Sequence, residues 1–269
     1  MLKKRVIFTL LHDDGNFYLS RNFRLQKVGN VHWLKRNYNF SQIAFSIDEL
    51  VILDVSRQPR DFDKFCAVIQ SIAQDIFVPL AAGGGIRSID HARLILKSGA
   101  DKVVLNTLLF DHGHIVEQIA RQFGRQAIVG SVDCKYAGEQ RRLEVFVENG
   151  ARRLDLSFDD ALVRLQALPI GELYVNSIDR DGTGFGYDTH LLERLPVNLE
   201  IPLILAGGAG KSAHLAEGLD RSAVDAVATA HLFNFVGDGL KNARAELLKE
   251  GYELAVWDLD MLDQLKDRK

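Results

Sequence analysis

Short apolar runs alternate with amphipathic stretches along most of the chain. Eight runs have the length and composition of buried strands: Val6–Leu11, Glu49–Val55, Val78–Ala82, Lys102–Asn106, Ala127–Asp133, Gly171–Ser177, Pro202–Ala206 and Ala226–Ala230. Between them, apolar residues recur at helical spacing, as in Phe62–Gln74, Ile89–Ser98, His114–Phe123 and Ala213–Leu219. Eight strands that alternate with helices predict an α/β fold in which parallel strands close into a (β/α)8 TIM barrel.

The second half of the chain repeats the first. The segment 76–88, which contains Gly83-Gly84-Gly85, returns as 200–212, so that Pro79 and Pro202 lie 123 positions apart. Glu49–Asp54 returns as Glu172–Ser177, and Ala100–Thr107 returns as Val224–His231. Three repeats in the same order predict a barrel built from two related half-barrels.

Two segments are too long to be ordinary connections between a strand and a helix. They are Asp13–Asn30, after the first predicted strand, and Tyr136–Leu156, after the fifth. Both leave the carboxyl ends of their strands, the end at which the active sites of such barrels lie. We therefore expect two extended loops beside the functional site.

Composition narrows the class of protein. The 269 residues fit one barrel, for which about 250 residues are typical, and 47% hydrophobic residues suffice for its core. A net charge of −3 gives no sign of binding to nucleic acid or to a membrane surface. Two cysteines, Cys66 and Cys134, predict no disulfide framework, and no apolar run reaches a membrane span. We expect one cytoplasmic barrel over residues 1–251, followed by a charged tail over 252–269.

The repeated glycine turns are candidate phosphate sites. Gly83-Gly84-Gly85 and Gly207-Gly208-Ala209-Gly210 lack side chains where backbone N–H groups would approach an anion. In each half the next strand ends in small or polar residues, Asn106-Thr107 and Thr229-Ala230-His231. Two such sites across the barrel mouth predict a substrate with a phosphate at each end, although tight turns alone would also need these glycines. The sequence predicts no cofactor and no metal site.

Several motifs resemble the cyclase subunit of imidazole glycerol phosphate synthase, the HisF family. They are Ser177–Thr183 with Gly186-Tyr187-Asp188, Gly83–Ser88, Gly99–Val103 and Met1–Ile7. The resemblance extends from Met1 to about Gly251. It implies a lyase of histidine biosynthesis that forms a heterodimer with a separate glutaminase subunit. Ammonia from that partner would pass through the barrel and cleave a ribulosyl bis-phosphate into imidazole glycerol phosphate and an aminoimidazole carboxamide ribotide.

The resemblance also implies roles for individual residues. Those for phosphate or substrate binding are Asp54, Gly84, Gly85, Asn106, Thr107, Asp181, Gly182, Gly207, Gly208, Ala230 and His231. The family usually has serine where this chain has His231. An ammonia gate would consist of Arg5, Glu49, Lys102 and Glu172, and Asp101 would face the glutaminase. Charged residues at this end of a barrel can also serve stability alone.

The catalytic pair that the resemblance implies is incomplete. The family uses aspartates at the ends of strands 1 and 5 as general acid and base. Asp133 occupies the second position, but Leu11 occupies the first, and Leu19 replaces a lysine in the following loop. Leucine cannot exchange a proton, and general acid–base catalysis contributes about 10²–10⁴-fold. His12 or Asp13 would reach the vacant position only through a register change or bulge, because neighbouring strand residues face opposite sides.

Three interpretations follow. The favoured one is a synthase-type subunit that delivers ammonia to a phosphorylated or sugar-nucleotide acceptor. It resembles the divergent family members encoded with surface-polysaccharide (lipopolysaccharide) genes, to which sugar amidation is attributed. The second is an orthodox cyclase with an altered first strand. The third is a barrel without catalytic activity that activates a glutaminase and conducts its ammonia to another protein.

Overall fold

Eight parallel strands close into a barrel. The computed structural model describes residues 3–38, 43–57, 59–137, 142–195, 199–231 and 238–256. Every neighbouring pair around the barrel is parallel, and β1 pairs with both β4 and β12. The barrel strands, in order, are β1 (Arg5–Asp13), β4 (Glu49–Asp54), β5 (Leu80–Gly83), β6 (Lys102–Leu105), β7 (Ile128–Ala137), β10 (Glu172–Ser177), β11 (Leu203–Ala206) and β12 (Ala226–Thr229). The predicted (β/α)8 fold is confirmed.

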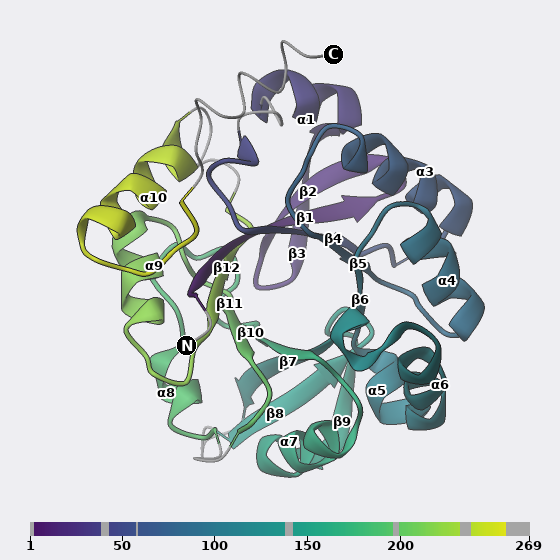
Figure 1. Cartoon of the computed structure of the whole chain (residues 1–269). Helices are drawn as coiled ribbons and strands as arrows, with labels where there is room; N and C mark the ends of the chain where they lie inside the picture. The colour runs from purple at the N-terminus through teal and green to yellow at the C-terminus, as the bar shows by residue number, and fades with distance from the viewer. Residues whose placement is uncertain are drawn as a thin grey trace.

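Helices encircle the strands (Figure 1). Two of the predicted helices begin where a side chain caps them: Asp61 accepts a hydrogen bond from the Lys64 amide, and Ser88 from the His91 amide. No helix of the described ranges is long and apolar enough to cross a membrane. The helices are α1 (Val31–Tyr38), α3 (Phe62–Ala73), α4 (Ile89–Lys97), α5 (Thr107–Asp111), α6 (Gly113–Phe123), α7 (Phe158–Ala167), α8 (Thr189–Leu192), α9 (Ser212–Leu219) and α10 (Gly239–Lys249), with a short 3₁₀ turn at Arg125–Ala127.

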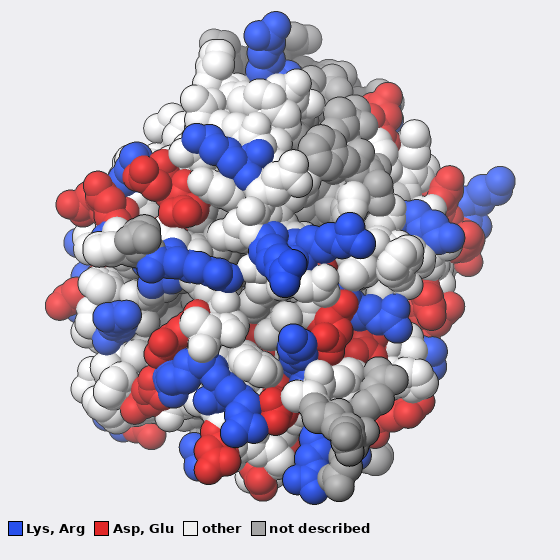
Figure 2. Space-filling view, turned by 180° about the vertical axis from the view of Figure 1, so that it is seen from behind, with Lys and Arg blue, Asp and Glu red and all other residues white. Residues whose placement is uncertain are grey.

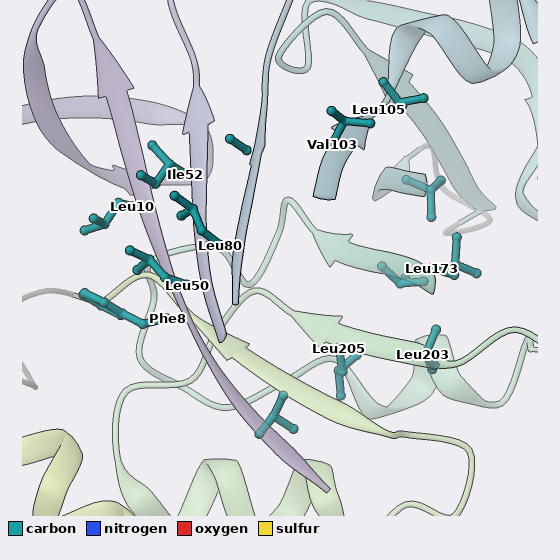
Figure 3. Packing of buried hydrophobic residues seen from close by; sticks show 14 of the residues in the cluster. Phe8, Leu10, Leu50, Ile52, Leu80, Val103, Leu105, Leu173, Leu203 and Leu205 are labelled. Carbon is teal, nitrogen blue, oxygen red and sulfur yellow. The ribbon is translucent and has the colours of Figure 1, made fainter. Parts of the chain in front are cut away.

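The alternation of strand side chains produces two cores. Outward-facing residues of the barrel strands, such as Phe8, Leu50 and Leu203 (Figure 3), belong to the larger core. This core also includes buried side chains of the helices. Inward-facing residues form a separate central core inside the barrel. Its members are Ile7, Val51, Ala81, Val104, Val129, Tyr174, Ile204, Ala206, Ala226 and Ala228. Packed side chains therefore fill the lumen, as is usual for this fold.

Both long connections form β-hairpins. β2 (Asn16–Arg21) pairs with the end of β1 and with β3 (Arg24–Asn30), while β8 (Arg142–Val147) pairs with the end of β7 and with β9 (Arg152–Ser157). The hairpins follow the first and fifth barrel strands, so the additions keep the two-fold repeat. The sequence predicted extended loops here and not strands. Most residues of β2, β3 and β9 are partly or fully exposed, whereas β8 alternates buried and more exposed residues, which is a strand signal.

The chain after α10 continues along the barrel. Leu254 is buried, and the Lys4 amide donates to the Glu253 carbonyl at 3.1 Å. The first residues of the predicted tail thus pack on the barrel rather than extending from it, and residues 257–269 lie outside the described ranges. The boundary at residue 251 stays a prediction.

Arg244→Met is expected to destabilise the fold by about 3–5 kcal/mol. Arg244 donates to both oxygens of Asp48, at 2.9 and 2.7 Å, and both side chains are buried. Without Arg244, the Asp48 carboxylate keeps only the Val6 amide as a hydrogen-bond donor among the described contacts. Urea unfolding measures the effect. Arg93→Met removes an ion pair with exposed Asp90 and should cost less than about 1 kcal/mol; equal losses would contradict the prediction.

Candidate active site

A pocket of about 900 Å³ opens at the carboxyl ends of the barrel strands. Its wall contains residues from the ends of β4, β7 and β10 and from the β2–β3 hairpin. All the residues to which the sequence assigned substrate binding line it, together with Asp133 and Leu11: Asp54, Gly84, Gly85, Asn106, Thr107, Asp181, Gly182, Gly207, Gly208, Ala230 and His231. The topology thus brings both halves of the predicted site to one mouth.

Asp133 is held by two amides. Asn176 Nδ2 donates to Asp133 Oδ1 at 3.0 Å, and Asn106 Nδ2 donates to Oδ2 at 3.2 Å. Burial raises the pKa of Asp133 to about 7. The hydrogen bond from Asn176 lowers this pKa, and the nearby charge of Asp181 raises it further. A carboxyl group with such a pKa is suited to both proton donation and proton acceptance near neutral pH.

Leu11 lies in the equivalent position across the pocket. It is 9% exposed, and its backbone pairs with Leu53 of β4 and Tyr18 of β2 in a regular register. Leu19 also lines the pocket. Leu11 and Leu19 therefore place apolar side chains in the pocket where the family resemblance implies an aspartate and a lysine.

His12 does not replace the missing group. The residue is 1% exposed, and its ring stacks on Phe65 of α3 with ring centroids 5.2 Å apart. Its Nε2 accepts a hydrogen bond from the Gly15 amide at 2.8 Å. Since β1 continues through this point without a bulge, His12 faces the helices while Leu11 faces the pocket. Asp13 is not among the pocket residues.

Asp54 lies at the outer edge of the pocket. Its Oδ1 accepts from the Ser56 amide at 2.9 Å and from Arg60 Nε at 3.4 Å, and its Oδ2 lies 3.6 Å from His12 Nδ1. Burial acts to raise the pKa of Asp54, but the contacts with His12 and Ser56 outweigh it, and the pKa lies below its ordinary value. Asp54 is therefore a charged carboxylate that anchors the loop between β4 and α3.

The two glycine turns have matching geometry. Gly84 and Gly208 have φ angles of +107° and +114°. A Cβ atom at Gly84 would lie 2.1 Å from the Asp54 carbonyl oxygen, and one at Gly208 would lie 2.1 Å from the Gly186 carbonyl oxygen. Both positions therefore require glycine, for conformation and for space. Such turns leave backbone N–H groups uncovered, as a phosphate site needs.

Asp181 and Gly182 hold the β2–β3 hairpin over the pocket. Asp181 Oδ2 accepts from Ser20 Oγ at 2.5 Å and from the Phe23 amide at 3.0 Å. Burial raises the pKa of Asp181, while these two hydrogen bonds act in the opposite direction. A Cβ atom at Gly182 would lie 1.7 Å from the Ser20 carbonyl oxygen. In the described contacts, Asp181 therefore stabilises the position of the β2–β3 hairpin at the pocket mouth.

Four charged residues close the opposite end of the lumen. Arg5 Nη1 lies 3.1 Å from Glu49 Oε2 and 2.9 Å from Glu172 Oε1. Lys102 Nζ lies 2.8 Å and 3.2 Å from the same two oxygens. Burial raises the pKa of Glu49, and Lys102 opposes this most. Each cation contacts both anions, so the four side chains form a continuous ring at the strand starts.

Tyr174 separates this charge ring from Asp133. Its hydroxyl lies 3.1 Å from Thr9 Oγ1, which joins β10 to β1 across the lumen. Glu172, Tyr174 and Asn176 are alternate residues of β10 and face inward, to the charge ring, to Thr9 and to Asp133 respectively. The sequence alone did not predict a role for Asn176 or Tyr174. For Asn176, the available signal was a polar residue near the end of an apolar strand.

Asp101 lies at the start of the strands. Its Oδ2 accepts from the Leu80 amide at 2.8 Å, and the equivalent Asp225 accepts from the Leu203 amide at 2.9 Å. The repeat therefore extends to individual hydrogen bonds. Because Asp225 makes the same contact in the other half, strand stability is enough to explain the hydrogen bond of Asp101. The Asp101 residue is nevertheless exposed, so it is accessible at the surface.

Asp133 should make stability depend on pH. Its pKa of about 7 in the folded state exceeds the roughly 4 of an unfolded aspartate. Its neutral form therefore stabilises the fold at low pH, and this contribution is lost as the pH rises from about 4 to about 7. Asp133→Asn keeps a neutral group. Relative to wild type, its free energy of unfolding in urea should rise by about 2–3 kcal/mol between pH 5 and pH 8; a constant difference would contradict the raised pKa.

Basic side chains are prominent on the face opposite to that in Figure 1. Figure 2 shows several Lys and Arg side chains across its middle, with acidic groups beside them. The arginines that line the pocket are Arg21, Arg24, Arg57, Arg60 and Arg87. The same pocket is lined by the acidic residues Asp54, Asp111, Asp133, Glu148 and Asp181, so its lining carries both signs of charge.

Comparisons with known proteins identify the family. The family model described as "Histidine biosynthesis protein" matches residues 26–237. A provisionally named imidazole glycerol phosphate synthase subunit hisF2 of Parasynechococcus marenigrum is 47% identical, over 96% of each chain. Subunit HisF of Pelodictyon phaeoclathratiforme is 34% identical over 95% of this chain and 100% of its own. Another provisional hisF2, from Pseudomonas aeruginosa, is 35% identical over 88% of this chain and 93% of its own. The chain therefore belongs to the histidine-biosynthesis family and is a HisF-like cyclase subunit of imidazole glycerol phosphate synthase.

Proposed function

We propose that this barrel receives ammonia from a HisH-type glutaminase at the charge ring and delivers it to an acceptor bound in the pocket. The acceptor is a phosphorylated sugar or a sugar nucleotide whose carboxyl or amide oxygen is first phosphorylated by ATP, so that this oxygen leaves as phosphate when ammonia forms the C–N bond. Asp133 is the acid/base group of the transfer, and Leu11 makes the ordinary cyclase reaction slow.

The observation that carries this proposal is the order of inward-facing groups along β10. Glu172 belongs to the charge ring, Tyr174 contacts Thr9, and Asn176 contacts Asp133. A molecule that enters at Arg5 and Lys102 and follows the lumen arrives at Asp133. Because side chains fill the lumen at the first two layers, both layers must open briefly for ammonia to pass.

The two ends of the barrel differ in how well they match the family: this favours a subunit with a different acceptor and the same source of ammonia. The four residues of the ring make all four of their possible ion pairs. In contrast, Leu11 removes one proton-transfer group from the pocket. The pocket has lost a proton-transfer group, but the charge ring at the other end of the barrel is complete. This combination fits a subunit that still conducts ammonia. The hisF2 relatives support a divergent branch, and we infer sugar amidation for surface polysaccharides as its biological role.

Isotope transfer tests this function. The complex of the barrel with a HisH-type glutaminase is given glutamine labelled with ¹⁵N in the amide, excess unlabelled ammonium, ATP, and either the ribulosyl bis-phosphate or a panel of sugar nucleotides. Ammonia that travels inside the barrel gives a ¹⁵N-labelled product despite the unlabelled ammonium. We expect label in a sugar nucleotide and little turnover of the bis-phosphate.

A ring variant supplies the matched control. Lys102→Met leaves Arg5 as the cation that pairs with Glu49 and Glu172 in the ring. We expect the ¹⁵N content of the product to fall toward that of the ammonium in solution. Rapid labelling of imidazole glycerol phosphate would instead establish the orthodox cyclase. Stimulated glutamine hydrolysis with no labelled product from either acceptor class would favour the barrel that only conducts ammonia.

A further inference from the structure

A second cavity adjoins the Gly84–Gly85 side of the pocket. It has a volume of about 430 Å³ and shares five residues with the main pocket: Ser56, Arg57, Arg60, Gly85 and Arg87. Phe62 and His91, whose rings stack with centroids 4.4 Å apart, also line it, as does Pro59. The cavity is therefore a side chamber of the candidate active site, bounded by the loops that precede α3 and α4.

Arginines dominate the lining of this side chamber. Arg60 is fixed by its Nε, which lies 3.4 Å from Asp54 Oδ1. Arg57 is fixed by a hydrogen bond from Nη2 to the Phe23 carbonyl at 2.8 Å. No carboxylate of the described residues lies within ion-pair distance of Arg57 or Arg87. Three guanidinium groups thus share one nearby carboxylate, and each has several donors to offer.

The glycine turn allows one of these arginines, Arg60, to approach the backbone closely. A Cβ atom at Gly85 would lie 2.5 Å from Arg60 Cδ and 2.9 Å from its Nε, so glycine allows the Arg60 side chain to lie directly against the turn. Arg87 follows the same turn by two residues. A phosphate on the Gly84–Gly85 backbone would therefore have Arg60 beside it, and Arg57 and Arg87 in the lining of the adjoining cavity.

We propose that the side chamber is a subsite for a second phosphate, so that this end of the acceptor is a diphosphate rather than a monophosphate. The inference rests on the phosphate site proposed above at the Gly84–Gly85 turn. The first phosphate of the diphosphate binds the turn, and its second phosphate binds Arg57, Arg60 and Arg87. Guanidinium groups bind phosphate oxygens through paired, charge-assisted hydrogen bonds. The organic group on that second phosphate lies toward Phe62 and His91.

Calorimetry with inorganic anions tests the subsite without ammonia, glutaminase or acceptor. Orthophosphate and pyrophosphate are titrated into the full chain in metal-free buffer. The affinity for orthophosphate measures binding at the glycine turn. The increase in affinity from orthophosphate to pyrophosphate measures the contribution of the side chamber. We expect pyrophosphate to bind at least tenfold more tightly, since one charge-assisted hydrogen bond contributes about tenfold or more in affinity.

Three variants localise the effect. Arg57→Met and Arg87→Met should each weaken pyrophosphate binding about tenfold and change orthophosphate binding less than twofold. Arg93→Met removes the same charge from α4 outside both cavities and should change neither. Equal affinity of the wild-type chain for the two anions, or equal losses in Arg87→Met and Arg93→Met, would overturn the proposal. A failure of isotope transfer with intact pyrophosphate selectivity would count against the proposed function alone.

Discussion

Asp133→Asn should reduce ammonia transfer to the acceptor by about 10²–10⁴-fold, the usual contribution of a general acid or base. Asparagine keeps the size of the side chain and can still accept a hydrogen bond from Asn176 or Asn106, so the pocket retains its shape. What is lost is a group whose pKa, at about 7, allows it to gain and release a proton near neutral pH. The measurement is the rate of ¹⁵N incorporation in the complex with glutaminase.

Glutamine hydrolysis in the same reaction is the internal control. The Asp133 side chain contacts Asn106 and Asn176 near the mouth, with Tyr174 between it and the charge ring, so hydrolysis by the partner should change less than about twofold. The wild-type rate should also change with pH around 7, rising if Asp133 acts mainly as a base. Unchanged transfer in the variant would mean that the barrel only conducts ammonia.

Leu11→Asp should create cyclase activity on the ribulosyl bis-phosphate. The substitution supplies the proton-transfer group that the family resemblance implies at this place. With Asp133 already held by two amides, the pair becomes complete, and ammonium-dependent turnover is expected to rise by about 10²–10⁴-fold. The assay uses excess ammonium above neutral pH without glutaminase, so that it reports on the pocket alone.

Leu11→Asn is the matched variant for this experiment. It introduces a polar group of the same shape at a position that is 9% exposed, but it cannot exchange a proton. Both variants are expected to lose a few kcal/mol of stability, because each places a polar group where leucine packs. A rise in turnover confined to Leu11→Asp identifies acid–base chemistry. Turnover by the wild-type chain at the rate of Leu11→Asp would show that Leu11 is tolerated.

The eight barrel strands could be predicted from sequence because parallel strands buried on both sides have a distinct composition. Leu203–Ala206 and Ala226–Thr229, for example, are continuous small or apolar runs. The β2–β3 and β8–β9 hairpins lack this signal. Their strands exist because the ends of β1 and β7 extend beyond the barrel and offer free edges for pairing.

Individual residues of the site divide in the same way. Asp133 and the glycine turns could be proposed from the internal repeat and the family motifs. Asn176 and Tyr174 could not, because their importance depends on the strands that β10 meets in the barrel: Asn176 is paired with Asp133 of the neighbouring strand β7. Tyr174 contacts Thr9, which lies 165 positions away in sequence.

The sequence by itself determined the barrel, its two-fold repeat, the family, and the exchange of an aspartate for Leu11. These follow from local composition and from residue identity, which do not depend on distant contacts. Only the tertiary structure decided that His12 stacks on Phe65 of α3, that the charge ring is closed, and that Arg57, Arg60 and Arg87 line one cavity with Gly85. Such facts depend on side-chain direction and on distances between segments far apart in the chain, and these are fixed only when the strands close into a barrel.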